Sequence, residues 1–428
     1  MGKKNRIHNI GFISTRIAGT DGVSFEIRKW AEVLERNGYT CFFFGGEIDR
    51  PPEKSRLCAE AHFDHPGIRE ITQHCFSRTT RDSSVSAMID HYRDLLRNEI
   101  HDFIMDFGLD CIIAENSLTI PMNIPLGLAV TRIIAETGMP VIAHHHDFSW
   151  ERDRFAINCA QDLLRMAFPP VFDCMKHVVI NSRASVDLSL RAGVSSTVIP
   201  NVFDFASPPA EEDPEITSRI RKLVGLGQDD PFILQPTRVV PRKWIERSID
   251  LVSRLGLKNP RLVISHSSGD EGGDYSLMLR DYAALMDVEL EFIDHVVSIE
   301  EGRVREGQFD ISDVYRAADL VTYPSGYEGF GNALLETFYF KKPVVVNRYP
   351  VFITDIEPRG FDVCRMDGFI TKDIIKRVTS LMRDRDLRHS MTEKNYHIAG
   401  KYFSYEMLEK QLLDIVREFD NRPVNPTG

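Results

Sequence analysis

The stretch Tyr323-Pro-Ser-Gly-Tyr-Glu-Gly-Phe-Gly-Asn-Ala-Leu-Leu-Glu336, followed by the apolar run at residues 343–346, predicts the fold of this chain. Residues 320–323 form a short β-branched and aromatic run, and residues 324–331 are rich in turn-forming residues. Asn332 then opens a segment whose apolar residues recur at helical spacing. The order strand, turn, helix, strand predicts a βαβ unit with a glycine-rich turn.

This glycine-rich turn favours an anionic ligand. Gly329 and Gly331 lack Cβ atoms, so backbone amides at the helix N-terminus can approach an anion, and the helix dipole favours negative charge there. Glu328 in the turn and Glu336 inside the helix would repel an isolated phosphate, so they are better explained as acceptors for hydroxyl groups. The combination suits a nucleotide sugar. The alternative is an ordinary βαβ unit with two surface glutamates.

The Glu-x7-Glu spacing from Glu328 to Glu336, with Lys342-Pro-Val-Val-Val346 after it, resembles the donor-site signature of the retaining glycosyltransferases of the GT4 family. The resemblance covers nearly the whole chain. It implies an α/β GT-B fold, in which two doubly wound Rossmann-like domains face each other across a cleft. It also implies that Glu328 orients the transferred sugar, that Glu336 holds the ribose, and that the donor is contacted by Gly329, Phe330, Gly331 and Asn332.

Length and composition indicate a soluble two-domain protein. The 428 residues suit two domains of roughly 200 residues each. The net charge of −11 argues against binding to nucleic acid or to an anionic membrane, so membrane contact is expected to be peripheral at most. Seven scattered cysteines without Cys-x-x-Cys spacing indicate reduced thiols, and residues 7–14 are too short and polar for a signal sequence. A cytoplasmic location is therefore expected.

Short apolar runs alternate with helical patterns along both halves, which is typical of doubly wound α/β domains. The pattern predicts a strand at residues 7–13, a helix at 24–37 and a strand at 40–44, whereas residues 46–81 look irregular and polar. Prolines and acidic residues within 200–217 indicate a domain boundary. The predicted division is 1–205 for an acceptor-binding domain, 206–402 for a nucleotide-sugar-binding domain, and 403–428 for a C-terminal helix that crosses back, with a tail.

Three cations follow the first strand of the second half, in Arg238-Val-Val-Pro-Arg-Lys243. Ligands of open α/β sheets bind at the carboxyl ends of the strands. Arg238 can form a forked hydrogen bond with a diphosphate and Lys243 can add a point charge, whereas Arg242 is expected to face outward. The spacing resembles the Arg-x4-Lys pair of the family. A solvated basic turn is the alternative.

Near the N-terminus, residues 18–24 connect the first strand to the first helix, with Asp21 or Ser24 as the N-cap. The family has a glycine loop at this place that meets the donor diphosphate and the acceptor. Gly22 and Val23 match that loop best, although the two adjacent glycines often seen there are missing. A plain strand-to-helix turn is the alternative.

A third group, His144-His145-His146, ends an apolar strand. Alternation places His144 and His146 on one face and His145 on the other, so a three-histidine metal site would need the strand to break. In the family a histidine here reaches the donor sugar near the reacting carbon. His146 fits that role best and His145 is second, and a purely structural role is the alternative.

Other polar groups are weaker candidates. Asn116 and Asn123 follow the strand at residues 111–114, and they are either donor or acceptor contacts or ordinary caps and turns. Glu115 and Ser117 follow the same strand and are weak acceptor-site candidates with the same alternative. Asp384-Arg-Asp386 resembles a metal-binding Asp-x-Asp, but it lies between helical stretches, which predicts a helix junction. No metal site is expected.

The expected activity is transfer of a hexose from a UDP-, GDP- or ADP-sugar to the hydroxyl of a sugar, sugar phosphate or glycan. Transfer is expected to retain the anomeric configuration and to need no metal or other cofactor. The alternative is a sugar-nucleotide epimerase or hydrolase on the same fold. An NAD-dependent dehydrogenase is disfavoured, because no Gly-x-Gly-x-x-Gly follows the first strand. The nucleotide base, the sugar, the acceptor and the oligomeric state stay open.

Overall fold

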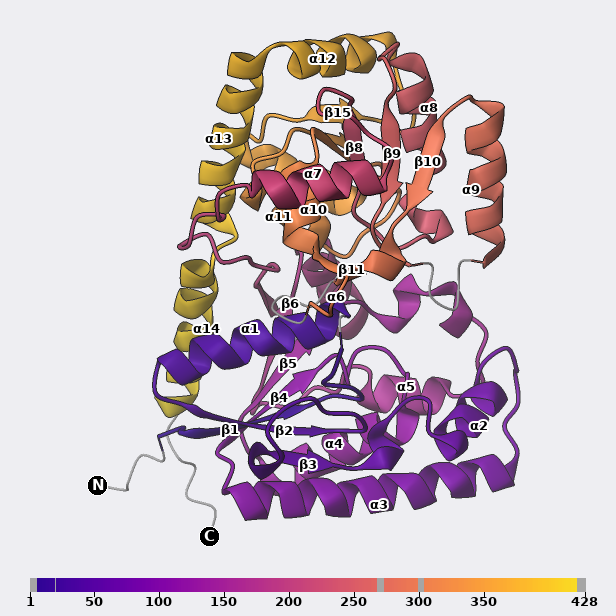
Figure 1. Ribbon diagram of the computed structural model, residues 1–428. Helices are drawn as coiled ribbons and strands as arrows, with labels where there is room; N and C mark the ends of the chain where they lie inside the picture. Colours follow the sequence, from indigo (N-terminus) through magenta and orange to yellow (C-terminus); the bar gives the residue numbers. More distant parts are fainter. Residues whose placement is uncertain (1–5, 20, 268–272, 299–303, 422–428) are drawn as a thin grey trace. The chain divides into compact units, whose positions relative to one another are not determined.

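The computed structural model describes residues 6–19, 21–267, 273–298 and 304–421 (Figure 1). The chain divides into two compact units. The first unit consists of the chain up to Pro200 together with the chain from Glu406 onward, and the second unit is Asn201–Tyr405. Each unit has its own parallel sheet.

The sheet of the first unit has the strand order β3-β2-β1-β4-β5-β6-β7. The order reverses between β1 and β4, which is the topological switch point of a doubly wound sheet. The strands are β1 (Asn9–Ile13), β2 (Thr40–Gly45), β3 (Ser55–Leu57), β4 (Cys111–Glu115), β5 (Val141–His145), β6 (Met175–Val179) and β7 (Ser196–Val198). The helices are α1 (Gly22–Arg36), α2 (Pro66–Cys75), α3 (Ser83–Phe107), α4 (Ile124–Thr137), α5 (Gln161–Ala167), α6 (Ser182–Ala192) and α14 (Tyr405–Asp420).

Helices cover both faces of this sheet, as expected for parallel strands whose residues are buried on both sides. In Figure 1, α1 and α3 lie on opposite sides of β1 and β2. Ile100 and Phe103 of α3 pack with Ile133 of α4 against β-strand residues such as Ile112. The helix α1 buries Trp30 on the other face. The sheet is therefore packed between helices on both faces, and this packing positions the side chains at its strand ends.

The prediction of irregular structure for residues 46–81 is wrong in part. The segment contains β3, which pairs in parallel with β2, and the ten-residue helix α2. Pro66 occupies the first turn of α2, where a missing N–H does no harm, and Ile68, Ile71 and Cys75 form its buried stripe. Three apolar positions in a polar stretch were too few to indicate a helix from the sequence.

The sheet of the second unit has the order β10-β9-β8-β13-β14-β15, with the switch point between β8 and β13. The strands are β8 (Phe232–Gln235), β9 (Arg261–Ile264), β10 (Glu289–Phe292), β13 (Leu320–Tyr323), β14 (Val344–Asn347) and β15 (Cys364–Met366), and β11 (Val297–Ser298) pairs separately with β12 (Phe309–Asp310). The helices are α7 (Pro214–Leu223), α8 (Glu246–Arg254), α9 (Gly273–Leu285), α10 (Ile311–Ala317), α11 (Asn332–Tyr339), α12 (Lys372–Arg383) and α13 (Arg385–Tyr402).

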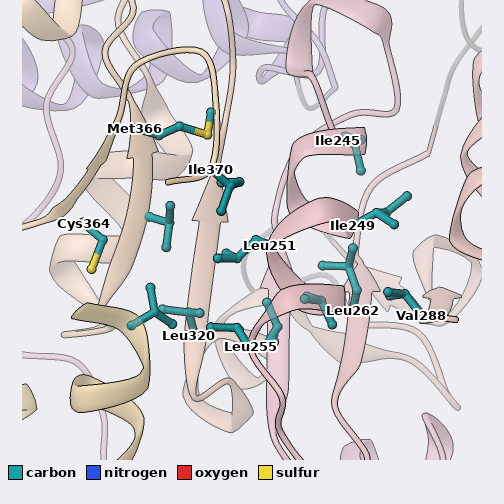
Figure 2. Packing of buried hydrophobic residues seen from close by; sticks show 14 of the residues in the cluster. Ile245, Ile249, Leu251, Leu255, Leu262, Val288, Leu320, Cys364, Met366 and Ile370 are labelled. Atoms are coloured by element: carbon teal, nitrogen blue, oxygen red, sulfur yellow. The ribbon is translucent and has the colours of Figure 1, made fainter. Parts of the chain in front are cut away.

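The core of this unit lies between the sheet and α8, α9 and α12. Figure 2 shows Ile249 and Leu251 of α8 beside Leu262 of β9 and Leu320 of β13, all of them buried. The βαβ unit predicted from the opening stretch is present as β13, α11 and β14. Within the described residues, no helix combines the length and the apolar character that crossing a membrane requires.

Candidate active site

Two loops of the second unit meet at its switch point. The loop after β8 contains Arg238 and Lys243, and the loop after β13 contains Glu328. Because β8 and β13 are parallel neighbours, their carboxyl ends lie at the same edge of the sheet. Gly326 N donates a hydrogen bond of 2.9 Å to the carbonyl of Arg242, so the two loops are in direct contact. The predicted donor residues of this unit are thereby brought together.

Glu328 is the centre of this cluster and is buried, contrary to the alternative of two surface glutamates. Its Oε1 is paired with Nζ of Lys243, and its Oε2 accepts a hydrogen bond of 3.0 Å from Nη1 of Arg242. The same Nη1 also donates to the carbonyl of Tyr327 at 3.2 Å. The expectation that Arg242 faces outward is therefore wrong, because its guanidinium turns back onto the second loop.

The charges of this cluster determine its ionisation. Burial acts to raise the pKa of Glu328, but Lys243 and Arg242 outweigh burial and lower that pKa to about 2. Burial lowers the pKa of Lys243, and Glu328 opposes that effect while Arg242 and Arg238 add to it. Glu328 is thus a carboxylate at neutral pH, held between two cations. Arg238 is exposed, and it lies close enough to influence Lys243.

Close packing fixes the shapes of both loops. A Cβ on Gly326 would come within 2.5 Å of the ring of Trp244, so a side chain at position 326 would displace that ring. Gly331 has a φ of +125°, and a Cβ there would meet the hydroxyl of Tyr349 at 2.7 Å. Both positions therefore favour glycine, and the positive φ of Gly331 adds to that preference at the start of α11.

The remaining predicted residues lie around α11. Phe330 is buried, and its carbonyl accepts a hydrogen bond of 2.6 Å from the hydroxyl of Tyr349. Asn332, the first residue of α11, accepts a hydrogen bond of 2.6 Å from Asn201. Glu336 is half-buried, and its Oε2 accepts a hydrogen bond of 2.9 Å from the hydroxyl of Tyr315. Gly329 precedes Phe330 in the loop.

In the first unit, the ends of β4 and β5 bring a carboxylate together with two histidines. Glu115 is fully buried, and Nδ1 of His144 lies 3.0 Å from each of its oxygens. Nε2 of His146 lies 3.3 Å from Oε2 of the same carboxylate. His144 also stacks on Trp30, with ring centroids 4.1 Å apart. His144 and His146 share a face, as alternation predicted.

Glu115 controls the protonation of this cluster. Burial acts to raise the pKa of Glu115, but the two histidines lower it to about 2. Burial acts to lower the pKa of His146, but the hydrogen bond and charge of Glu115 raise it. Burial lowers the pKa of His144, with Glu115 opposing. His146 therefore keeps its proton to higher pH than an ordinary histidine. One ligand atom from each residue lies within 4.8 Å of the others, so the same three could hold a metal ion.

His145 points to the other face of β5. Its Nδ1 lies 2.6 Å from Oγ1 of Thr119, and its Nε2 lies 3.0 Å from Nδ1 of His177, so protein groups meet both ring nitrogens. Asn116 follows β4 with a φ of +54°. Its side chain accepts a hydrogen bond of 3.1 Å from the backbone N–H of His146 and donates one of 3.2 Å to Asp147. Asn116 thus positions the residues that end β5.

The other candidates of this unit lie at helix starts. Asn123 is the N-cap of α4, and its amide nitrogen donates to the carbonyls of Glu60 and Ala61, so it has the capping role that the sequence left open. Gly22 opens α1. Asp21 is the N-cap there, and it accepts a hydrogen bond of 3.0 Å from the N–H of Val23. A donor phosphate would compete with Asp21 for that amide.

The profile of the family described as "Glycosyl transferases group 1" matches residues 217–398. Two curated relatives, the mannosylglucosylglycerate synthases of Petrotoga mobilis and Thermotoga maritima, are each 32% identical to this chain. The alignment with the Petrotoga protein covers 83% of this chain and 85% of that protein. The alignment with the Thermotoga protein covers 94% of this chain and 97% of that protein. The chain belongs to the group 1 glycosyltransferases.

Solved structures resemble this glycosyltransferase over almost its whole length. A glycosyltransferase from Rickettsia africae is 13% identical, with a TM-score of 0.70 over 98% of this chain and 100% of that chain. Anabaena Alr3699/HepE in complex with UDP-glucose is 14% identical, with a TM-score of 0.64 over 96% and 99%. These similarities confirm the predicted GT-B fold.

Two contacts of candidate site residues were not predicted from the sequence. Tyr315 contacts Glu336 from a different helix, and no local pattern links residues 21 positions apart. Glu115 was expected only as a weak acceptor-site candidate, and its contact with His144 and His146 was not expected. Its place at the end of β4 beside His144 follows from the pairing of β4 with β5 in register Glu115 to His144. A charged residue ending an otherwise apolar strand was the available signal.

Replacing Glu115 by glutamine is expected to destabilise the protein by about 3 kcal/mol at pH 6, because the lowered pKa of the carboxylate stabilises the folded state. This stabilisation is complete above the ordinary pKa of 4.5 and is lost as the pH falls toward about 2. Denaturant unfolding of both proteins from pH 6 to pH 2.5 should show the difference shrinking. The exposed Glu70→Gln on α2 is the control, and a difference that does not change with pH would contradict the assignment.

Proposed function

We propose that this glycosyltransferase transfers a mannosyl group from a nucleotide diphosphate mannose to a hydroxyl of glucosylglycerate, with retention at the anomeric carbon. The observation that carries the substrate assignment is the 32% identity, over nearly full length, to two mannosylglucosylglycerate synthases. In a product of that name the mannosyl group is the outer sugar, so it is the group added to glucosylglycerate. The acceptor is then a small and water-soluble anion.

The charge balance at the switch point of the second unit supports a diphosphate donor. Arg238, Arg242 and Lys243 carry three positive charges, and Glu328 removes one of them. The remaining charge of +2 suits a diphosphate linked at both ends, which carries about two negative charges. Arg238 is exposed and can form a forked hydrogen bond with the diphosphate. Lys243 is buried and paired with Glu328, and it contributes a point charge. The structure of Anabaena Alr3699/HepE with UDP-glucose is consistent with a nucleotide-sugar ligand in this fold.

In the proposed reaction, the bond between the anomeric carbon and the diphosphate oxygen breaks as the acceptor oxygen bonds to the same face of that carbon. The acceptor proton passes to the departing diphosphate. Negative charge develops on the leaving group, so the fixed cations stabilise the transition state more than the bound donor. Glu328 orients the hydroxyls of the sugar, Glu336 holds the ribose, and His146 offers a protonated ring to the donor sugar.

The test is to incubate the enzyme with glucosylglycerate and with GDP-, UDP- or ADP-mannose in turn, and to identify products by mass spectrometry and NMR. One of the three donors should give a mannosylated glucosylglycerate with the α configuration of the donor. Inverted product would contradict retention. Free mannose without transfer would indicate a hydrolase, and a new sugar nucleotide would indicate an epimerase.

Transfer is expected to continue in the presence of a chelator, because Arg238, Arg242 and Lys243 supply the positive charge that a metal would otherwise bring to the diphosphate. Initial rates should be measured after dialysis against EDTA and again with added magnesium, manganese or zinc. Complete loss with EDTA and recovery with one metal would contradict this prediction. In that case Glu115, His144 and His146 would be the ligands to mutate first.

A further inference from the structure

A cavity of the second unit lies at the end of its strands opposite to the loops with Arg238 and Glu328. It has a volume of about 840 Å³ and is lined by α7, by the residues that precede β13 and β14, and by the first turns of α13. The loops with Arg238 and Glu328 follow strands β8 and β13, whereas this cavity meets the residues at the start of β13 and β14. It shares no residue with the candidate donor site.

The lining of this cavity is strongly basic in a chain of net charge −11. Seven of its residues are lysine or arginine, and three are acidic. Two of the three carboxylates are already paired. Asp319 accepts from Arg221 at 3.4 Å, and Glu393 is 2.8 Å from Nζ of Lys341. The cavity therefore keeps an excess of positive charge.

Some of these cations have a structural role and others do not. Arg221 also donates to the carbonyl of Ala317 at 3.1 Å, and Arg388 donates to the carbonyl of Leu381 at the end of α12. By contrast, Lys222 and Arg385 are exposed on the cavity wall. The structure records no hydrogen bond or ion pair for either side chain within the described residues. These two side chains are available to a ligand.

Among these cations, Lys342 gives the strongest indication that the cavity binds an anion. Its ammonium donates a hydrogen bond of 2.7 Å to the carbonyl of Arg316, which satisfies one of its three N–H groups. Burial lowers its pKa to about 8, although Glu212 and Asp319 act in the opposite direction. The protonated form is therefore poorly stabilised by its surroundings. An anion in the cavity would provide the missing counter-charge.

We propose that this cavity binds a small phosphorylated compound that carries at least two negative charges. A volume of 840 Å³ suits a ligand of metabolite size. The residues that line it include no phenylalanine, tyrosine or tryptophan, and the single aromatic ring among them is the imidazole of His389, so the wall offers a nucleobase little stacking surface. A phosphorylated compound without a base fits this wall better than a nucleotide does.

The probe for the test is fructose 1,6-bisphosphate, titrated calorimetrically into the full-length enzyme and its variants. Lys222→Glu and Arg385→Glu should each weaken binding at least tenfold, because each replaces a cation of the cavity wall by an anion. Both side chains are exposed, so the replacements should leave the fold intact. Lys376→Glu on α12 is the matched control, because it changes the charge of the same unit equally from an exposed position outside the cavity. The control should bind like the wild type.

Three results would overturn the proposal. The first is no binding at millimolar probe, and the second is an equal loss in Lys376→Glu, which would indicate a non-specific charge effect. The third is loss of binding in Arg238→Ala with full binding in Lys222→Glu, because the probe would then occupy the candidate donor site. The proposal does not depend on the mannosyl acceptor, so its failure would leave the proposed function untouched.

Discussion

Replacing Lys243 by methionine should weaken donor binding by about 1.5 to 3 kcal/mol, the range for a hydrogen bond with a charged partner. The same change should lower the free energy of unfolding by about 3 kcal/mol, because it removes one partner of a buried ion pair. Arg242 stays in contact with Glu328, which places the loss at the lower end of the usual range. Calorimetry with UDP and GDP and denaturant unfolding measure the two effects.

Arg238→Ala separates binding from stability. Arg238 is exposed, so its removal should weaken nucleotide diphosphate binding by a similar amount with little change in unfolding. Unchanged affinity for UDP and GDP in both variants would rule out the assignment of these cations to the diphosphate. A loss of stability in Lys243→Met without any loss of binding would give Lys243 a purely structural role.

The second large effect concerns Glu328 and Glu336, which are assigned to different ends of one donor. Glu328→Gln should lower turnover by a factor of 100 or more, about 3 kcal/mol, while free nucleotide affinity stays nearly unchanged. An interaction made mainly in the transition state lowers the rate without a matching loss of ground-state binding. Glu336→Gln should instead weaken free nucleotide diphosphate and intact donor alike. Nucleotide affinity and transfer rate should be measured for both variants.

Tyr315→Phe is the matched control for Glu336, because it removes only the hydroxyl that donates to this carboxylate. It should weaken nucleotide binding less than Glu336→Gln does. If Glu328→Gln loses nucleotide affinity while Glu336→Gln keeps it, the placement of the donor on this motif is reversed. Stability must be checked for Glu328→Gln, since that change leaves Lys243 buried without its carboxylate.

The sequence was most informative where local pattern and tertiary structure agree. Residues 320–323 were expected as a strand and Asn332 as a helix start, and the structure has β13 and α11 with those starts. A strand buried on both faces needs a continuous apolar run, so its limits are visible directly. The Glu-x7-Glu spacing likewise spans only one turn and the helix that follows it. The positions of Glu328 and Glu336 relative to each other therefore depend on local sequence alone.

Features that depend on rare backbone shapes or distant partners could not be predicted. Arg242 turns inward because residues 241–243 form a tight 3-10 turn and Trp244 has a φ of +49°. Nothing in the spacing of Arg238 and Lys243 indicates such a turn. The pairing of His146 with Glu115 likewise needs the register between β4 and β5, which the sequence of either strand alone does not specify.

The position of α14 in the chain affects how the first unit folds during synthesis. Residues from Glu406 belong to the first unit, so α14 completes that unit after the chain has passed through the second. Asp420 accepts a hydrogen bond of 2.9 Å from the N–H of Ile7, and Leu412 and Val416 are fully buried. On the ribosome, the sheet from β1 to β7 must wait for about 200 further residues before this apolar stripe covers it. Until then the first unit exposes the surface that α14 later buries, and it becomes complete only after residues 405–420 have been synthesised.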